Sequence, residues 1–167
     1  GADLSTSNLS RTQFQNSSFK DANLSDANLD STEFKDSDLS RANFKRASFK
    51  YAKCNGIHAK NVNFTEVLLH FSDFTNSVMD NSNFYNAYLW KTNFKGASLK
   101  NANFNETEAG DVSFKEADLS GANFNKTRLE NVNLEGSNLE KTDFRGAIVH
   151  WSNFRHAKLE GADFRKA

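Results

Sequence analysis

The residues of this chain that could do chemistry are one cysteine, four histidines and many carboxylates. A thiol beside an imidazole can act as a nucleophile, and clustered His, Cys, Asp and Glu side chains can hold a metal ion. His58, His70, His150 and His156 are dispersed, and no two of them have metal-ligand spacing. Neither a glycine-rich phosphate loop nor a nucleophile elbow is present. We therefore predict that the protein is not an enzyme, with no catalytic, cofactor-binding or metal-binding residues.

The element that must position all side chains is a five-residue repeat. From Leu4 to Phe164 every fifth residue is a centre, and the phase never slips. Fifteen of the thirty-three centres are Phe and thirteen are Leu. The residue two positions before a centre is Ala, Ser, Thr or Val, with Ile57 as the single larger exception. A fixed phase of five matches neither a helix nor a simple strand, so it indicates a repeating backbone unit.

Each repeat consists of a short extended stretch followed by a corner. We write the centre as i, so that residues i−2 and i share one face of the stretch and point inward. Seven of the eight glycines stand at i+2, and Asn recurs there. Gly and Asn tolerate the backbone angles of tight turns, so i+2 is the predicted corner. Proline is absent, which is typical of a chain whose N–H groups are needed between coils.

Repeats such as Ala42-Asn43-Phe44 and Gly121-Ala122-Asn123-Phe124 resemble the A(D/N)LXX pattern of the pentapeptide-repeat family. The resemblance covers the whole chain. It implies an all-β fold, a right-handed quadrilateral parallel β-helix of about eight coils with four repeats per coil. We expect one domain over residues 1–167. Two segments, 51–60 and 105–112, place Cys54, Ala59 and Ala109 at centres and are expected to be locally irregular, through a bulge or thin packing.

Four repeats per coil place residues twenty apart above one another, in four faces. Face one, centred on Leu4 to Phe164, and face three, centred on Phe14 to Phe154, hold thirteen of the fifteen central Phe residues. Faces two and four are otherwise aliphatic or small. We therefore predict two opposed Phe ladders in the core. The i−1 residues of face one are all Asn or Asp, which predicts a ladder of hydrogen-bonded side chains. Cys54 is expected to be a buried, inert thiol.

The composition limits the partners and the compartment. There are 21 basic and 21 acidic residues, so no positive stripe for direct nucleic-acid binding is present. No apolar run is long enough to cross a membrane. By default we expect a soluble, cytoplasmic protein. The chain begins with Gly and its only Met is Met79, which leaves open a removed targeting peptide.

Exposed aromatic residues are expected to gather on face two, centred on Leu9 to Val149. Phe71 is the only Phe outside a centre, and both tryptophans fall on this face. Stacked aromatics rimmed by polar residues indicate a protein interface, although these side chains could instead cover a bulge at residues 51–60. We call the predicted group the face-two patch, and it includes Tyr85, which lies on face one of the same coil as Trp90. The patch consists of Tyr51, Leu68, His70, Phe71, Tyr85, Tyr88, Trp90, Ile148, His150 and Trp151.

Two functions remain open from the sequence. The first is a rigid binding module that presents the face-two patch to an unidentified protein, with a possible homodimer through the solenoid ends. The second comes from the resemblance alone, since some pentapeptide-repeat proteins mimic DNA, bind DNA gyrase and protect it from quinolones or toxins. That function implies an acidic surface, whereas here Lys and Arg interrupt the acidic columns.

Overall fold

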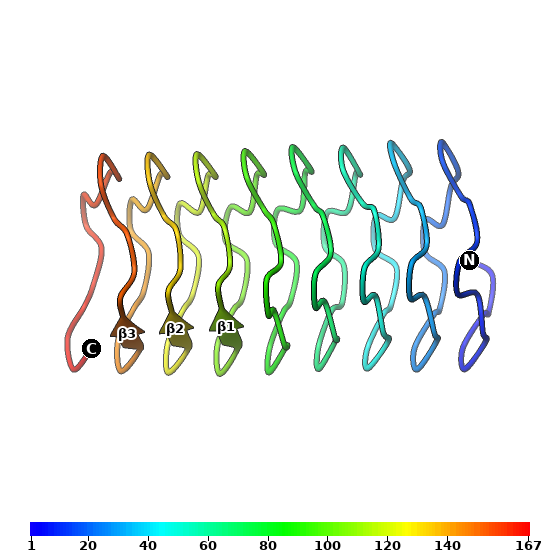
Figure 1. Ribbon diagram of the computed structural model, residues 1–167, viewed down its shortest axis with the longest axis horizontal. Coiled ribbons are helices and arrows are strands. Elements are labelled where there is room, and N and C mark those ends of the chain that lie inside the picture. Colours follow the sequence, from blue (N-terminus) through cyan, green and yellow to red (C-terminus); the bar gives the residue numbers. More distant parts are fainter.

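The chain forms one continuous coil around a narrow core. The computed structural model describes residues 1–167, and the two termini lie at opposite ends of a rod (Figure 1). Every β-bridge is parallel and joins residues twenty apart, such as Asn43 with Asn63 and Asp38 with His58. Each coil is therefore built from four repeats. The predicted right-handed quadrilateral parallel β-helix is confirmed.

Continuous strands form on one face only. They are β1 (Glu108–Gly110), β2 (Arg128–Glu130) and β3 (Ile148–His150), which pair in parallel in the order β1-β2-β3. Elsewhere the ladder consists of isolated bridges at i−1 positions. All three strands belong to face two. The structure contains no helix that is long and apolar enough to cross a membrane.

The repeat pattern follows from how each backbone N–H finds an acceptor, as residues 42–46 show. The N–H of Ala42 donates to the carbonyl three residues back, which closes the corner. Asn43 donates to the preceding coil, while Phe44 and Arg46 donate to the next coil. The N–H of Lys45 donates to the side-chain Oδ1 of Asn43 at 3.2 Å. An Asn or Asp at i−1 thus satisfies the one N–H that the coils cannot reach.

The i+2 corner has left-handed backbone geometry throughout the rod. Six glycines stand there with φ between 66° and 71°, and non-glycine residues occupy the other corners with similar angles. Because a side chain in this region usually costs about 1–2 kcal/mol, the corner favours Gly and Asn. Bulky residues at this position, such as Phe71 and Trp151, are accommodated against the local preference.

The core consists of the two predicted Phe ladders, with the aliphatic centres of faces two and four and the small residues at i−2 packed between them. On face one, Phe84 stacks on Phe104 with ring centroids 4.8 Å apart, and on face three Phe94 stacks on Phe114 at 5.2 Å. Rings from the two faces meet edge to face, as in Phe104 with Phe114 at 5.5 Å and 77°. All of these rings are fully buried, as is Cys54.

The polar ladder on face one is also confirmed. The side-chain amide of Asn43 donates to Asn23 at 3.0 Å, and that of Asn63 donates to Asn43 at 2.9 Å. Donation runs from a rung to the preceding one at Asn23, Asn43, Asn63 and Asn103, whereas the amide of Asn83 donates to Oγ1 of Thr65 at 3.0 Å. Asp3 can therefore stand at the first rung, because it only has to accept, and it does so from Asn23 at 3.1 Å.

The segments expected to be irregular keep the twenty-residue register. Lys53 bridges Asp73 and His58 bridges Val78, so the ladder runs through residues 51–60 without a bulge. What changes is the corner, since no hydrogen bond from residue i+3 to residue i closes the turns after Cys54 and Ala59. In residues 105–112, Glu108–Gly110 form strand β1, and the corner at Asp111 keeps its left-handed geometry with φ of 53°.

Candidate functional site

Face two departs from the rest of the rod at the i−1 position. From residue 48 onward this position carries no Asn or Asp, and its side chains form one row down the bridge ladder. Leu68 bridges Tyr88, and Tyr88 bridges Glu108. Arg128 and Ile148 continue the row in β2 and β3. Side chains that cap an N–H in every repeat of face one are replaced here by side chains that face outward.

The first half of the face-two patch contains three aromatic side chains, and Lys91 lies beside two of them. The rings of Tyr51 and Phe71 are stacked, with centroids 5.0 Å apart and planes within 8°. The Nζ of Lys91 lies 5.6 Å from the centroid of the Phe71 ring and 6.0 Å from that of Trp90. Such distances allow cation–π attraction. Tyr51, Phe71 and Trp90 are 58%, 44% and 45% exposed, so this order exists on an open surface.

Trp90 lies flat over Gly110 in the next coil. A Cβ atom built at Gly110 would come within 2.7 Å of Cε3 of Trp90, so a side chain at this position would displace the indole. Gly110 is also where strand β1 ends and the corner changes type. The glycine therefore fixes the orientation of one exposed tryptophan.

Two shallow hollows connect the halves of the patch, and Gly110 lines both. The first, of about 110 Å³, lies among His70, Tyr88 and Trp90 on one side and Glu108, Arg128 and Glu130 on the other. The second, of about 140 Å³, runs from Trp90 past Asp111, Glu130 and Asn131 to Trp151. A trough thus follows face two from His70 to Trp151.

The second half of the patch lies at the far end of this trough. Trp151 is 82% exposed, and its ring centroid lies 5.8 Å from that of His150. Ile148 is exposed at the preceding outward position in β3. A tryptophan this open has few contacts within the chain to hold it, so its contribution to stability is small.

One predicted patch residue lies apart. Tyr85 belongs to face one, where its hydroxyl donates to Glu106 at 2.8 Å. That hydrogen bond raises the pKa of the Tyr85 hydroxyl, with the charge of Glu106 adding to it. Tyr85 lines neither hollow. The structure brings the other nine residues to face two, and it leaves Tyr85 around the corner from them.

Burial shifts the pKa of two groups, one in the patch and one in the core. Burial, together with the charge of Lys50, lowers the pKa of His70 and so favours its neutral form. Burial and the charge of Asp73 raise the pKa of the Cys54 thiol well above its usual range. No group of three or more His, Cys, Asp or Glu side chains could hold a metal ion.

The sequence reasoning missed the floor of the trough. Gly110 is the one glycine that stands at i+1, and the sequence predicts local irregularity in residues 105–112 rather than part of a site. The signal that could have found it is its position twenty residues after Trp90. Residues one coil apart are stacked, so a glycine there leaves room for the indole.

Comparison with known proteins agrees with this architecture. A family model described as pentapeptide repeats (8 copies) matches residues 7–46, 42–81 and 77–114. A second model, described as a pentapeptide repeat region, matches residues 108–167. Together they cover nearly the whole chain. No curated protein matches the sequence.

Solved structures show the same fold at low identity. HetL, a pentapeptide repeat protein involved in heterocyst differentiation regulation in the cyanobacterium Nostoc, is 24% identical. The match covers 98% of this chain and 81% of HetL, with a TM-score of 0.53. A trypsin-treated variant of QnrB1, a plasmid-mediated fluoroquinolone resistance protein, is 18% identical over 99% of this chain and 89% of its own, with a TM-score of 0.67. These likenesses show a shared fold.

Proposed function

The chain belongs to the pentapeptide-repeat family, and we propose that it is a non-catalytic scaffold that binds another protein through the face-two patch. The observation that carries this proposal is the row of exposed aromatic side chains beside a trough on one side of an otherwise polar rod. Trp and Tyr are enriched among residues that dominate protein interfaces, where they fill pockets on the partner. Contiguous exposed apolar surface of this kind marks interaction sites.

The backbone of the rod restricts how a partner can bind. The N–H groups on the sides of the rod already donate to neighbouring coils or to side chains, as in residues 42–46. An added strand would need unpaired backbone groups, which the sides do not offer. A partner must therefore recognise outward side chains, and face two carries most of the large apolar ones.

The corner positions supply a second argument. Tyr51, Phe71 and Trp151 have φ of 60°, 60° and 53°, in the region that favours Gly or Asn. They also leave large apolar surface in water. Since Asn would suit both the backbone and the solvent better, stability of the rod does not explain these residues. Binding to a partner protein explains them, because it removes their apolar surface from water.

The test uses substitutions that the corner accepts. We expect Phe71→Asn and Trp151→Asn, singly and together, to abolish capture of a protein partner from cell extract while leaving the melting temperature unchanged or higher. Lys141→Asn is the matched control, because Lys141 has the same geometry, with φ of 58°, and belongs to opposite face four. A partner set that is the same for the double variant and for the Lys141 control would refute the proposal.

The alternative of DNA mimicry gains no support from the charge pattern. Many carboxylates on the rod are paired with cations, as in Asp21 with Arg41 at 2.6 Å and Asp26 with Arg46 at 2.7 Å, each one coil apart. A surface standing in for phosphates needs unpaired negative charge. A gyrase supercoiling assay with and without the protein tests this alternative directly, and we expect no change in activity.

A further inference from the structure

A basic hollow lies on a different part of the rod, near the C-terminal end of face one. Its volume is about 370 Å³, and no acidic or apolar residue lines it. The rod as a whole is neutral, with 21 basic and 21 acidic residues, so a hollow lined by four cations is a local departure. The lining residues are Asn125, Lys126, Arg145, Gly146, Arg165 and Lys166.

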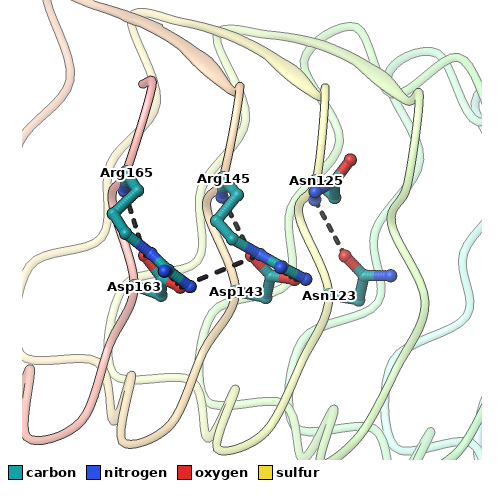
Figure 2. A network of polar contacts seen from close by, with 6 residues as sticks. All are labelled: Asn123, Asn125, Asp143, Arg145, Asp163 and Arg165. Atoms are coloured by element: carbon teal, nitrogen blue, oxygen red, sulfur yellow. Dashed lines mark hydrogen bonds and ion pairs between the residues drawn. The ribbon is translucent and has the colours of Figure 1, made fainter.

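The two arginines of the hollow are held in place by carboxylates of their own repeats. Arg145 donates from Nε to Oδ1 of Asp143 at 2.9 Å and from Nη2 to Oδ2 at 2.7 Å. Arg165 makes the same pair of bonds to Asp163, at 3.0 and 2.6 Å (Figure 2). The Nη1 group of each arginine has no protein partner. Two guanidinium groups are thereby fixed in successive coils, about 4.8 Å apart, with donors unused.

This arrangement coincides with a change in the polar ladder. In the preceding rung Asn123 caps the N–H of Asn125 at 2.9 Å, as a neutral pair. At the next two rungs the ladder residue becomes Asp and the residue two positions later becomes Arg. The aspartates cannot continue the donor chain between rungs. What they do is orient the guanidinium groups, which Figure 2 shows lying side by side.

The remaining two cations and a glycine complete the hollow. Lys126 and Lys166 occupy corner positions one coil before and one coil after Gly146. Gly146, with φ of 68°, has no side chain to fill the space between them. Asp143 and Asp163 offset the charge of the two arginines. Asp163 also lies 3.8 Å from Nε of Arg145. Glu106 lies 3.8 Å from Nζ of Lys126, and both of these side chains are exposed.

We propose that this hollow binds a phosphate group. A carboxylate needs only one guanidinium for bidentate pairing, whereas two stacked guanidinium groups with two flanking ammonium groups suit a tetrahedral dianion with several acceptor oxygens. The phosphate lies over Gly146, accepts hydrogen bonds from Nη1 of Arg145 and Arg165, and is flanked by the charges of Lys126 and Lys166. This site is independent of the face-two patch.

The test is a titration of the whole chain with inorganic phosphate, followed by amide NMR shifts. We expect saturable shifts confined to residues 125, 126, 145, 146, 165 and 166. Gly146→Asn fills the hollow with the residue most typical of this corner and leaves the charge unchanged, and it is expected to weaken binding by about tenfold or more. The paired change Asp143→Asn with Arg145→Asn restores the chemistry of the preceding rung, also without changing net charge, and should have a similar effect.

The matched control is Gly136→Asn, because Gly136 has the same corner geometry, with φ of 66°, outside the hollow. It should bind phosphate as the unmodified chain does. The same titration with O-phosphoserine, and co-sedimentation with vesicles containing phosphatidic acid, show whether a free phosphomonoester or a lipid headgroup supplies the phosphate. Non-saturating shifts spread over all lysines would overturn the proposal, and so would Gly146→Asn binding phosphate as well as Gly136→Asn does.

Discussion

Asparagine side chains on face one should contribute more to stability than asparagines at the same repeat position elsewhere. The side chain of Asn43 takes part in three hydrogen bonds. It donates to Asn23 at 3.0 Å, accepts from the amide of Asn63 at 2.9 Å and caps the N–H of Lys45 at 3.2 Å. Asn28 on face two makes only the capping bond, to the N–H of residue 30 at 3.0 Å.

A hydrogen bond contributes about 1 kcal/mol net to folding. Asn43→Ala should therefore lower the free energy of unfolding by about 3 kcal/mol, and Asn28→Ala by about 1 kcal/mol. Differences in strand preference between Asn and Ala cancel in the comparison, because both positions have the same backbone geometry. For a chain of this size the difference of about 2 kcal/mol corresponds to about 4–8 °C in melting temperature.

The measurement is urea unfolding followed by both circular dichroism and tryptophan fluorescence. Agreement of the two signals shows that the rod unfolds as one unit, since repeat arrays can lose cooperativity. If the Asn43 and Asn28 variants lose the same stability, the ladder bonds contribute nothing beyond the capping of the corner. The argument from stacked amides would then be refuted.

Three further outcomes follow from burial and charge. Phe84→Ala should lower the free energy of unfolding by about 3–5 kcal/mol, because the Phe84 ring is fully buried between rings whose centroids lie 5.0 and 4.8 Å away. Phe164→Ala should lower it less in the same urea experiment, because Phe164 is 39% exposed. Cys54 should react with a thiol reagent only after denaturant is added, since burial raises its pKa; reaction at the rate of a free thiol in the folded state would contradict this. Hydrogen bonding to Arg165 lowers the pKa of Asp163 from 3.8 to about 2. Its stabilising effect should be present above about pH 4 and lost as the pH falls toward 2, and Arg165→Gln should return the carboxyl pKa, followed by NMR, toward 3.8.

The fold was predictable because the repeat constrains every coil in the same way. One inward pair of residues and one corner per repeat suffice to specify the register, and the phase holds from Leu4 to Phe164. The capping of the i+1 N–H by Asn or Asp was less visible. The residue type was evident from the A(D/N)LXX pattern, but only the hydrogen bonds show why that type is needed.

The candidate sites were predictable in part. Aligning residues twenty apart is enough to gather the exposed aromatics Tyr51, Phe71, Tyr88, Trp90 and Trp151 on face two. The repeat assigns Tyr85 to face one of the same coil as Trp90, and only the structure shows that it lines neither hollow. The basic hollow was not predicted from the sequence. Arg145 and Arg165 belong to a balanced set of 21 basic and 21 acidic residues, and nothing in the sequence distinguishes these two from the other basic residues. Only the structure shows that their own aspartates turn the two guanidinium groups in parallel.

Both sites depend on what an outward glycine leaves empty. Where a glycine follows Asp or Asn by twenty residues, as Gly56 follows Asp36 and Gly96 follows Asn76, the earlier side chain occupies the space. Gly110 instead follows Trp90, which covers it with an indole and borders two hollows. Gly146 follows a lysine whose Cγ would lie 3.8 Å from an added Cβ, so the space stays open. Each of the three hollows described above is lined by Gly110 or Gly146. Whether a glycine opens a site or merely forms a corner is therefore decided by the residue one coil earlier, together with the charged or aromatic side chains around it.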